Sequence, residues 1–400
     1  MGLGVLAFIL ALVVSIMLHE AGHLLTAKHY GMKATQYFLG FGPTLFSFRR
    51  GETEYGVKAI PAGGFVKIVG MTQLEELDPK DEPRAFWRQR AGQRTVVLAA
   101  GSVTHFVLAV ILIFITLTLV GLPGISTKVE VVSTCVTKDE DKDCTAADPV
   151  APARAAGLQP GDRVLAFEGK RVEDWVDDFS TRVRAHPGGP ATLVIERDGR
   201  ELTLRPVVAL ALRDDPDRPG QKKEVGQLGV RPAEENRRYG PIAAVRKTAS
   251  GTKDAFVLTF KGIAALPAAV PKGFSQAFTG KERTADGIVS PVGLGRVSGQ
   301  AIAEGAFSEF LIIVAGFNIF IGVMNLLPLL PLDGGHLAVL GYEEARSWWA
   351  RRRGRRDPGR VDIRKLMPVA QLVIILFASL FFVALYADIA NPLANPFSPG

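Results

Sequence analysis

Residues 2–27 read GLGVLAFILALVVSIMLHEAGHLLTA, an apolar run in which no charged side chain comes before Glu20. A helix rises about 1.5 Å per residue, so this run is long enough to cross a hydrocarbon core of roughly 30 Å. A signal peptide is the alternative, but the run lacks a basic n-region and a short apolar core followed by a small-residue cleavage site. The run therefore predicts a membrane-spanning helix.

Three further apolar stretches follow, at residues 96–121, 310–340 and 367–386. The first and the last are uncharged, and Asp333 is the only carboxylate of the middle one. The composition agrees, because 48% of the residues are hydrophobic and the mean hydropathy of +0.19 is high for a soluble protein. The sequence therefore predicts a multi-pass α-helical membrane protein with four transmembrane helices.

The positive charge of the chain gathers in short segments next to these spans. Residues 346–365 hold nine arginines and lysines against two acids, and residues 28–95 are basic as well. The positive-inside rule places both segments in the cytoplasm, so residues 122–309 are predicted to be extracytoplasmic. Anionic lipid headgroups are sufficient partners for the arginine run, and no nucleic-acid partner is predicted.

The predicted domains follow this alternation of apolar and polar segments. In order, they are a first span (1–27), a cytoplasmic loop (28–95) with a membrane-associated β-hairpin at about 52–70, a second span (96–121), an extracytoplasmic domain (127–232), an amphipathic or linker region (233–309), a third span with a broken helix (310–340), a basic cytoplasmic loop (341–366), a fourth span (367–386) and a tail (387–400).

The segment from 127 to 232 is predicted to be a soluble α+β domain, with β-prone runs around one short helix at 174–184. Cys135 and Cys144 fall on the predicted oxidising side, where they can close a small disulfide loop or remain free thiols. From 241 to 266, apolar and basic residues mix at helical spacing. Such a helix can lie on the membrane surface or be buried in the soluble part.

Two imidazoles in the first span are spaced as metal ligands. Residues four apart lie on one face of a helix, so His19 and His23 can point at one ion, with Glu20 beside that face. Zinc accepts imidazole nitrogen and carboxylate oxygen in a tetrahedral shell. Two histidines packed in a helix bundle are the alternative. However, about 13 Å of helix separates His19 from the charged end at Lys28, and polar groups at that depth are costly.

A catalytic zinc needs a third protein ligand, for which Asp333 is the best candidate. The third span runs in the same direction as the first, since one span separates them. Asp333 would lie about 15 Å from the charged end at Glu343 if helical, a depth that matches that of His19. Pro328 and Pro331 break the helix just before it, as is tolerated along a water-filled cavity or, alternatively, at a transporter-type kink.

Together these motifs resemble those of the site-2 protease family of intramembrane metalloproteases. The resemblance spans nearly the whole chain and rests on His19-Glu20-x-x-His23, Leu332-Asp333-Gly334, the turn at 63–67, a PDZ-like segment at 153–169 and Ser290-Pro-Val-Gly293. It implies four transmembrane segments, an extracytoplasmic PDZ-like insert and a place in the bacterial cytoplasmic membrane. It also implies cleavage of single-span membrane proteins, such as anti-sigma factors and remnant signal peptides, after a first cut by a site-1 protease.

The resulting hypothesis assigns zinc to His19, His23 and Asp333, and general acid–base work to Glu20. A substrate helix must unwind before it is cut, because its carbonyls are engaged in its own hydrogen bonds.

Substrate-binding residues are expected in two places. The hairpin can pair with the extended substrate by strand addition, and Asn325 in the broken helix can hydrogen-bond its backbone. The hairpin residues predicted to take part are Gly63, Gly64 and Phe65.

Two other functions are alternatives to the protease. A non-enzymatic scaffold that recruits partners through the PDZ-like segment would carry no zinc. A transporter with a midplane ion site would often show inverted repeats, which this sequence lacks. A soluble zinc protease is excluded by the four apolar spans.

Overall fold

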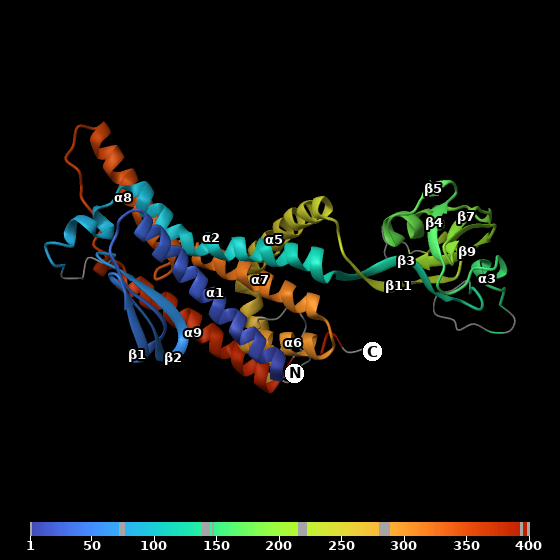
Figure 1. The fold of residues 1–400 in the computed structure, drawn as a ribbon, viewed down its shortest axis with the longest axis horizontal. Coiled ribbons are helices and arrows are strands. Elements are labelled where there is room, and N and C mark those ends of the chain that lie inside the picture. Colours follow the sequence, from blue (N-terminus) through green and yellow to red (C-terminus); the bar gives the residue numbers. More distant parts are fainter. Residues whose placement is uncertain are drawn as a thin grey trace. The chain divides into compact units, whose positions relative to one another are not determined.

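The structure is a computed structural model that describes residues 2–71, 77–137, 145, 148–214, 222–279, 289–392 and 395–397. It divides into two compact units, Gly121–Arg238 and the remainder of the chain (Figure 1). Within the described residues, four helices are long and apolar enough to cross a membrane: Gly2–His29, Ala91–Val120, Phe307–Asn325 and Arg364–Ala390. The prediction of a multi-pass membrane protein is therefore confirmed.

The larger unit is a bundle of long helices that expose apolar side chains. Leu3 and Leu10 in the first helix are 74% and 61% exposed, and Phe382 in the last is 64% exposed, a surface that lipid can cover. The helices of this unit are α1 (Gly2–His29), α2 (Ala91–Ile115, extended by a π-helical turn, Thr116–Val120), α5 (Pro241–Thr279), α6 (Pro291–Ala303), α7 (Phe307–Asn325), α8 (Asp333–Arg352) and α9 (Met367–Ala390). Helix α2 packs against both α1 and α7.

The helix is interrupted where the sequence predicts a break in the third span, since α7 ends at Asn325 and α8 begins at Asp333. Helix α8 then continues beyond the predicted end at residue 340, to Arg352. The turn between α7 and α8 contains Pro328 and Pro331, which cannot donate backbone hydrogen bonds. Glycine is needed where α8 passes this turn, since a Cβ on Gly335 would lie 2.6 Å from the backbone nitrogen of Leu330.

The basic loop predicted at 341–366 is partly wrong, because α8 continues to Arg352. Arg351 and Arg352 lie in its last turn, where cations interact favourably with the negative end of the helix dipole. The charged composition that suggested a loop is therefore compatible with a helix end.

The predicted amphipathic segment is longer than expected and forms α5, which packs against α2, α7 and α9. Helix α5 thus belongs to the helical unit and is not a buried helix of the soluble part. The short helix α6 begins at the Ser290 motif: the Ser290 hydroxyl accepts hydrogen bonds from Val292 and Gly293, and the Ser290 N–H donates to Asp388 of α9 at 2.7 Å. Gly293 leaves room for that carboxylate.

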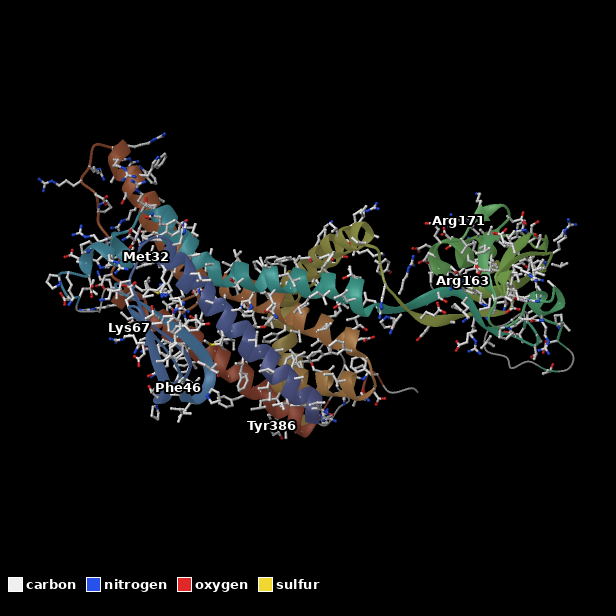
Figure 2. The ribbon with its side chains drawn as sticks, viewed as in Figure 1. Met32, Phe46, Lys67, Arg163, Arg171 and Tyr386 are labelled. Carbon is white, nitrogen blue, oxygen red and sulfur yellow. The ribbon has the colours of Figure 1, made fainter. Side chains whose placement is uncertain are left out.

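The β-hairpin is larger than the predicted 52–70, because β1 (Ala34–Arg50) pairs along its whole length with β2 (Thr53–Ile68). Each strand bends, so that Tyr37 has Tyr55 as its partner on one side and Val66 on the other. The sequence did not predict β1, because the glycines and the proline at residues 40–43 are typical of a turn. In the structure Gly40 and Gly42 have positive φ, which allows the strand to bend there. Met32 and Lys67 lie toward one end of this sheet and Phe46 toward the other (Figure 2).

The smaller unit, Gly121–Arg238, is an α+β arrangement around its own apolar core, which includes Phe167, Phe179 and Ile195. Its main sheet has the order β11-β3-β4-β7-β8, with β5 beside β4, and a second sheet has the order β10-β9-β6. The elements are β3 (Leu122–Val132), α3 (Pro152–Ala155), β4 (Arg163–Phe167), β5 (Lys170–Arg171), a π-helical segment (Trp175–Ser180), α4 (Thr181–Ala185), β6 (Gly189–Pro190), β7 (Leu193–Arg197), β8 (Arg200–Leu204), β9 (Val207–Asp214), β10 (Lys222–Gln227) and β11 (Val230–Arg237).

Asp162 anchors the loop before β4 in this unit. Its side chain is almost completely buried and accepts hydrogen bonds from Arg197 at 2.6 and 2.7 Å and from the Gln159 N–H at 2.8 Å. Cys135 is disulfide-bonded, so it is not a free thiol, and Cys144 lies outside the described residues.

Candidate metal centre

The two histidines of the first motif project from adjacent turns of α1 into the helix bundle. His19 is 8% exposed and His23 is 5% exposed. The helical spacing brings their Nε2 atoms to 3.1 Å from each other. The pair thus forms a buried polar cluster inside an otherwise apolar helix.

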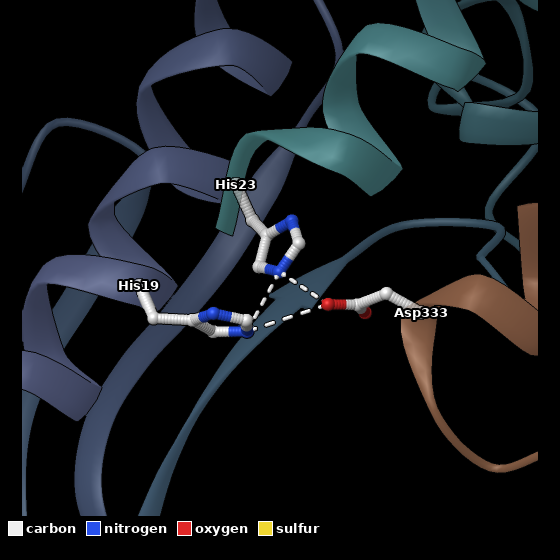
Figure 3. A group of neighbouring side chains, drawn as sticks. All are labelled: His19, His23 and Asp333. Carbon is white, nitrogen blue, oxygen red and sulfur yellow. Dashed lines mark hydrogen bonds and ion pairs between the residues drawn. The ribbon is translucent and has the colours of Figure 1, made fainter. Parts of the chain in front are cut away.

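Asp333 reaches this cluster from the first turn of α8 (Figure 3). Its Oδ2 atom lies 3.4 Å from His19 Nε2 and 3.3 Å from His23 Nε2. Among the described residues these three form a group whose ligand atoms lie close enough to share one metal ion. Asp333 follows the two histidines by more than 300 positions in the sequence. The three residues predicted as ligands nevertheless lie side by side in the structure.

The spacing of the three ligand atoms fits zinc. Ligands about 2.0–2.1 Å from a tetrahedral ion lie about 3.3 Å from one another. The three separations here are 3.1, 3.3 and 3.4 Å. The donor set fits as well, since two imidazole nitrogens and one carboxylate oxygen leave a fourth tetrahedral position open, as catalytic zinc requires.

A backbone contact fixes the orientation of His23. Its Nδ1 atom is 2.7 Å from the carbonyl oxygen of Val97 in α2, so Nδ1 carries the proton and donates it. The Nε2 lone pair is thereby directed toward Asp333 and His19, as a metal ligand needs.

The second helix approaches this cluster so closely that glycine is required. A Cβ on Gly101 of α2 would lie 2.5 Å from His23 Nε2 and 2.6 Å from His19 Nδ1, too close to both imidazole rings. Gly22 in α1 has the matching role, since a Cβ there would lie 2.8 Å from the Ala100 carbonyl oxygen. Gly101 is not predictable from the sequence, because an isolated glycine in an apolar helix carries no periodic signal.

Glu20 lies at the edge of the ligand group and faces the β-sheet. It interacts electrostatically with His19, His23 and Asp333, and the backbone N–H of Val66 in β2 donates to its carboxylate. A Cβ on Gly64 would lie 3.4 Å from Glu20 Cγ, so β2 passes directly beside this acid. A carboxylate in this position can exchange protons with a molecule that lies between the ligands and β2.

The residues predicted to bind substrate lie in two elements, of which β2 passes beside Glu20. Gly63 has φ +116°, a conformation that favours glycine, and starts the segment of β2 that passes Glu20. Phe65 stacks on Phe38 and Phe41 within the sheet, with ring centroids 5.8 Å apart in each pair. Asn325 is half-buried at the C-terminal end of α7.

Two other histidines near the centre are not part of the ligand group. His105 in α2 is hydrogen-bonded through Nδ1 to Asn318 of α7 at 2.8 Å, and its ring lies 5.0 Å from that of His19. His336, one turn beyond Asp333, lines a cavity with Arg94 and Glu343. His105 and His336 therefore lie next to the group formed by His19, His23 and Asp333 without belonging to it.

Comparison with known proteins identifies the family to which this chain belongs. The model of peptidase family M50 matches residues 7–356. The chain belongs to this family, the site-2 protease family.

The chain is also similar to named M50 relatives over almost its whole length. It is 36% identical over 406 residues to the zinc metalloprotease Rip1 of Mycolicibacterium smegmatis and 36% identical over 401 residues to Rip1 of Mycobacterium tuberculosis, with 98% of each chain covered. It is 27% identical over 419 residues to the zinc metalloprotease RasP of Geobacillus kaustophilus, with 86% of this chain and 90% of the relative covered. The M50 protein described here is therefore a zinc metalloprotease, and its metal is Zn²⁺.

The close approach of α2 predicts that Gly101→Ala will abolish or strongly weaken zinc binding, because the added methyl group clashes with both imidazole rings and displaces them. We expect zinc content, measured by mass spectrometry of metals in purified protein, to fall well below one ion per chain. Gly92→Ala is the matched control in the same helix, since a Cβ there meets no atom within 4 Å. Full zinc content in Gly101→Ala would contradict the placement of the metal.

Proposed function

We propose that this M50 protease cleaves single-span membrane proteins inside or next to the bilayer, using a zinc ion held by His19, His23 and Asp333. The observation that carries the proposal is the depth of the ligand group. His19 lies nine residues before Lys28 in a 28-residue apolar helix, about 13 Å of helix from its charged end. A buried cluster of ionisable groups at that level serves chemistry on a membrane-embedded substrate.

Each residue of the centre has a distinct part in peptide hydrolysis. Zinc, when bound, supplies Lewis-acid chemistry that polarises a carbonyl and acidifies water. His23, oriented by the Val97 carbonyl, and Asp333, carried by α8, bind and position the metal together with His19. The Glu20 carboxylate takes the proton of the attacking water and delivers it to the leaving nitrogen of the cleaved peptide bond.

The β-sheet beside Glu20 holds the substrate in an extended form. A membrane-spanning helix must unwind before its carbonyls are open to attack, and the unwound backbone then needs new hydrogen-bond partners. The segment of β2 at Gly63, Gly64 and Phe65 offers backbone groups next to Glu20 for strand addition. Asn325 at the end of α7 adds a side-chain amide for the same purpose.

The smaller unit acts as a PDZ-like filter on the extracytoplasmic side. The basic segments 28–95 and 346–365 favour a cytoplasmic location, which leaves residues 122–309 on the other face. A folded unit there would exclude large ectodomains or bind the new C-terminus that a site-1 protease leaves. Cleavage of anti-sigma factors and remnant signal peptides as the second cut of regulated intramembrane proteolysis is consistent with this order.

The proposal predicts that Glu20→Gln retains zinc but loses turnover by at least about a hundredfold, because an amide cannot accept the proton from water. The test is co-expression of wild type or variant with a panel of tagged single-span membrane proteins, followed by detection of cleavage fragments. We expect fragments with the wild type and accumulation of uncleaved substrate with Glu20→Gln.

A matched control is Glu54→Gln, which removes a carboxylate that is hydrogen-bonded to Ser47 in the sheet. This variant should cleave as the wild type does. Normal cleavage by Glu20→Gln would remove Glu20 from the mechanism.

The filter role predicts that replacing residues 121–238 by a short Gly/Ser linker will relax substrate choice and spare the chemistry. Membrane proteins with intact ectodomains should then be cut without a first cleavage, and Glu20→Gln in the same shortened chain should stop this activity. A shortened protein that binds zinc but cuts nothing would count against the filter.

A further inference from the structure

A second site lies beside the end of α1, away from the metal ligands. Four residues line an open pocket there: Lys28 of α1, Phe48 and Arg50 of β1, and Tyr55 of β2. The Lys28 Nζ donates a hydrogen bond to the Tyr55 hydroxyl at 3.1 Å and lies 5.5 Å from the centre of its ring. Phe48 stacks on Tyr55 with ring centroids 5.5 Å apart, so the floor of the pocket is aromatic.

The pocket carries two positive charges, and neither Lys28 nor Arg50 forms a salt bridge with the acids of the described residues around it. Glu52 is bound by Arg84 through two hydrogen bonds of 2.7 and 2.8 Å, and this guanidinium holds the pKa of the Glu52 carboxyl below its ordinary value. Lys28 acts on Glu52 only as a weaker, more distant charge. Glu54 lies next to Tyr55 in β2, so its side chain points to the opposite face of the sheet. Lys28 and Arg50 thus remain available to an anion.

An apolar strip leads away from these cations along the same face of β1. Phe46, Phe48 and Arg50 alternate along the strand, which places the three side chains on one face. Phe46 is 63% exposed and Phe48 is 53% exposed, and their ring centroids are 6.1 Å apart. Figure 2 labels Phe46 on the sheet. Two large exposed aromatic rings next to a cationic pocket match an amphipathic ligand.

The length of α1 favours a position of the site at the level of lipid headgroups. Helix α1 has 28 residues and is therefore about 42 Å long, more than the roughly 30 Å of a hydrocarbon core. Lys28 lies in its last turn, where a cation meets the phosphate layer rather than acyl chains.

We propose that this pocket binds the phosphate group of an anionic phospholipid, with an acyl chain of the lipid against Phe46 and Phe48. Arginine and lysine both bind phosphate oxygens well, arginine through a planar fork of donors. An inorganic phosphate ion shares the headgroup chemistry but makes no use of the exposed rings, so the apolar strip favours a lipid. The bound lipid would hold the β1–β2 sheet at the membrane interface.

The test uses the purified full chain, equilibrated with vesicles of equal parts phosphatidylglycerol and phosphatidylcholine, and native mass spectrometry of the lipids that stay bound. We expect phosphatidylglycerol to be retained in preference to phosphatidylcholine. Lys28→Gln and Arg50→Gln should each lower this preference about fivefold, the effect of removing one cation at a membrane surface. Zinc content of the same samples reports whether each variant is folded.

Arg49→Gln is the matched control, because it removes the same charge from the neighbouring residue on the opposite face of β1. It should leave the lipid preference unchanged. Equal losses with Arg49→Gln and Arg50→Gln, or equal retention of the two lipids by the wild type, would overturn the proposal. Inorganic phosphate that displaces phosphatidylglycerol at equal concentration would also overturn it, since the site would then serve a soluble anion.

Discussion

The Asp333 carboxylate and two imidazole nitrogens face one another in the interior of an apolar helix bundle, with separations of 3.1 to 3.4 Å. A buried carboxylate with neutral neighbours costs several kcal/mol in desolvation. A divalent cation held by these three atoms, as proposed, would offset this cost and link α1 to α8. Such a metal would stabilise the junction between two segments that are far apart in the sequence.

The same geometry depends on how closely helix α2 can approach. Glycine at positions 22 and 101 lets α1 and α2 pack backbone to backbone, which brings the Val97 carbonyl to His23 Nδ1 at 2.7 Å. On the other side of α1, the Tyr37 hydroxyl donates to the Met17 carbonyl at 2.6 Å and docks the β-sheet beside Glu20. In the proposed mechanism, α1 would therefore carry the metal ligands toward α2 and Glu20 toward the β-sheet that receives the substrate.

The sequence predicted the centre better than it predicted the elements around it. His19 and His23 follow from helical spacing, and Asp333 follows from the depth of a lone carboxylate in a parallel span. The end of α7, the start of α8 and the length of β1 depend on Gly334, Gly335 and the bend at residues 40–43, which act through close tertiary contacts. Gly101 likewise acts through a close tertiary contact, with the rings of His19 and His23. Such contacts leave no periodic pattern, so a single sequence does not reveal them.

The most direct test of the remote ligand is X-ray absorption at the zinc edge of purified Asp333→Cys protein, compared with the wild type. A thiolate at position 333 should add one sulfur neighbour at about 2.3 Å, whereas the wild type should show only nitrogen and oxygen neighbours, including two imidazoles. Asp357→Cys, an exposed acid beyond α8, should add no sulfur. Zinc bound in Asp333→Cys without a sulfur neighbour, or a third imidazole in the wild type, would contradict the assignment of Asp333.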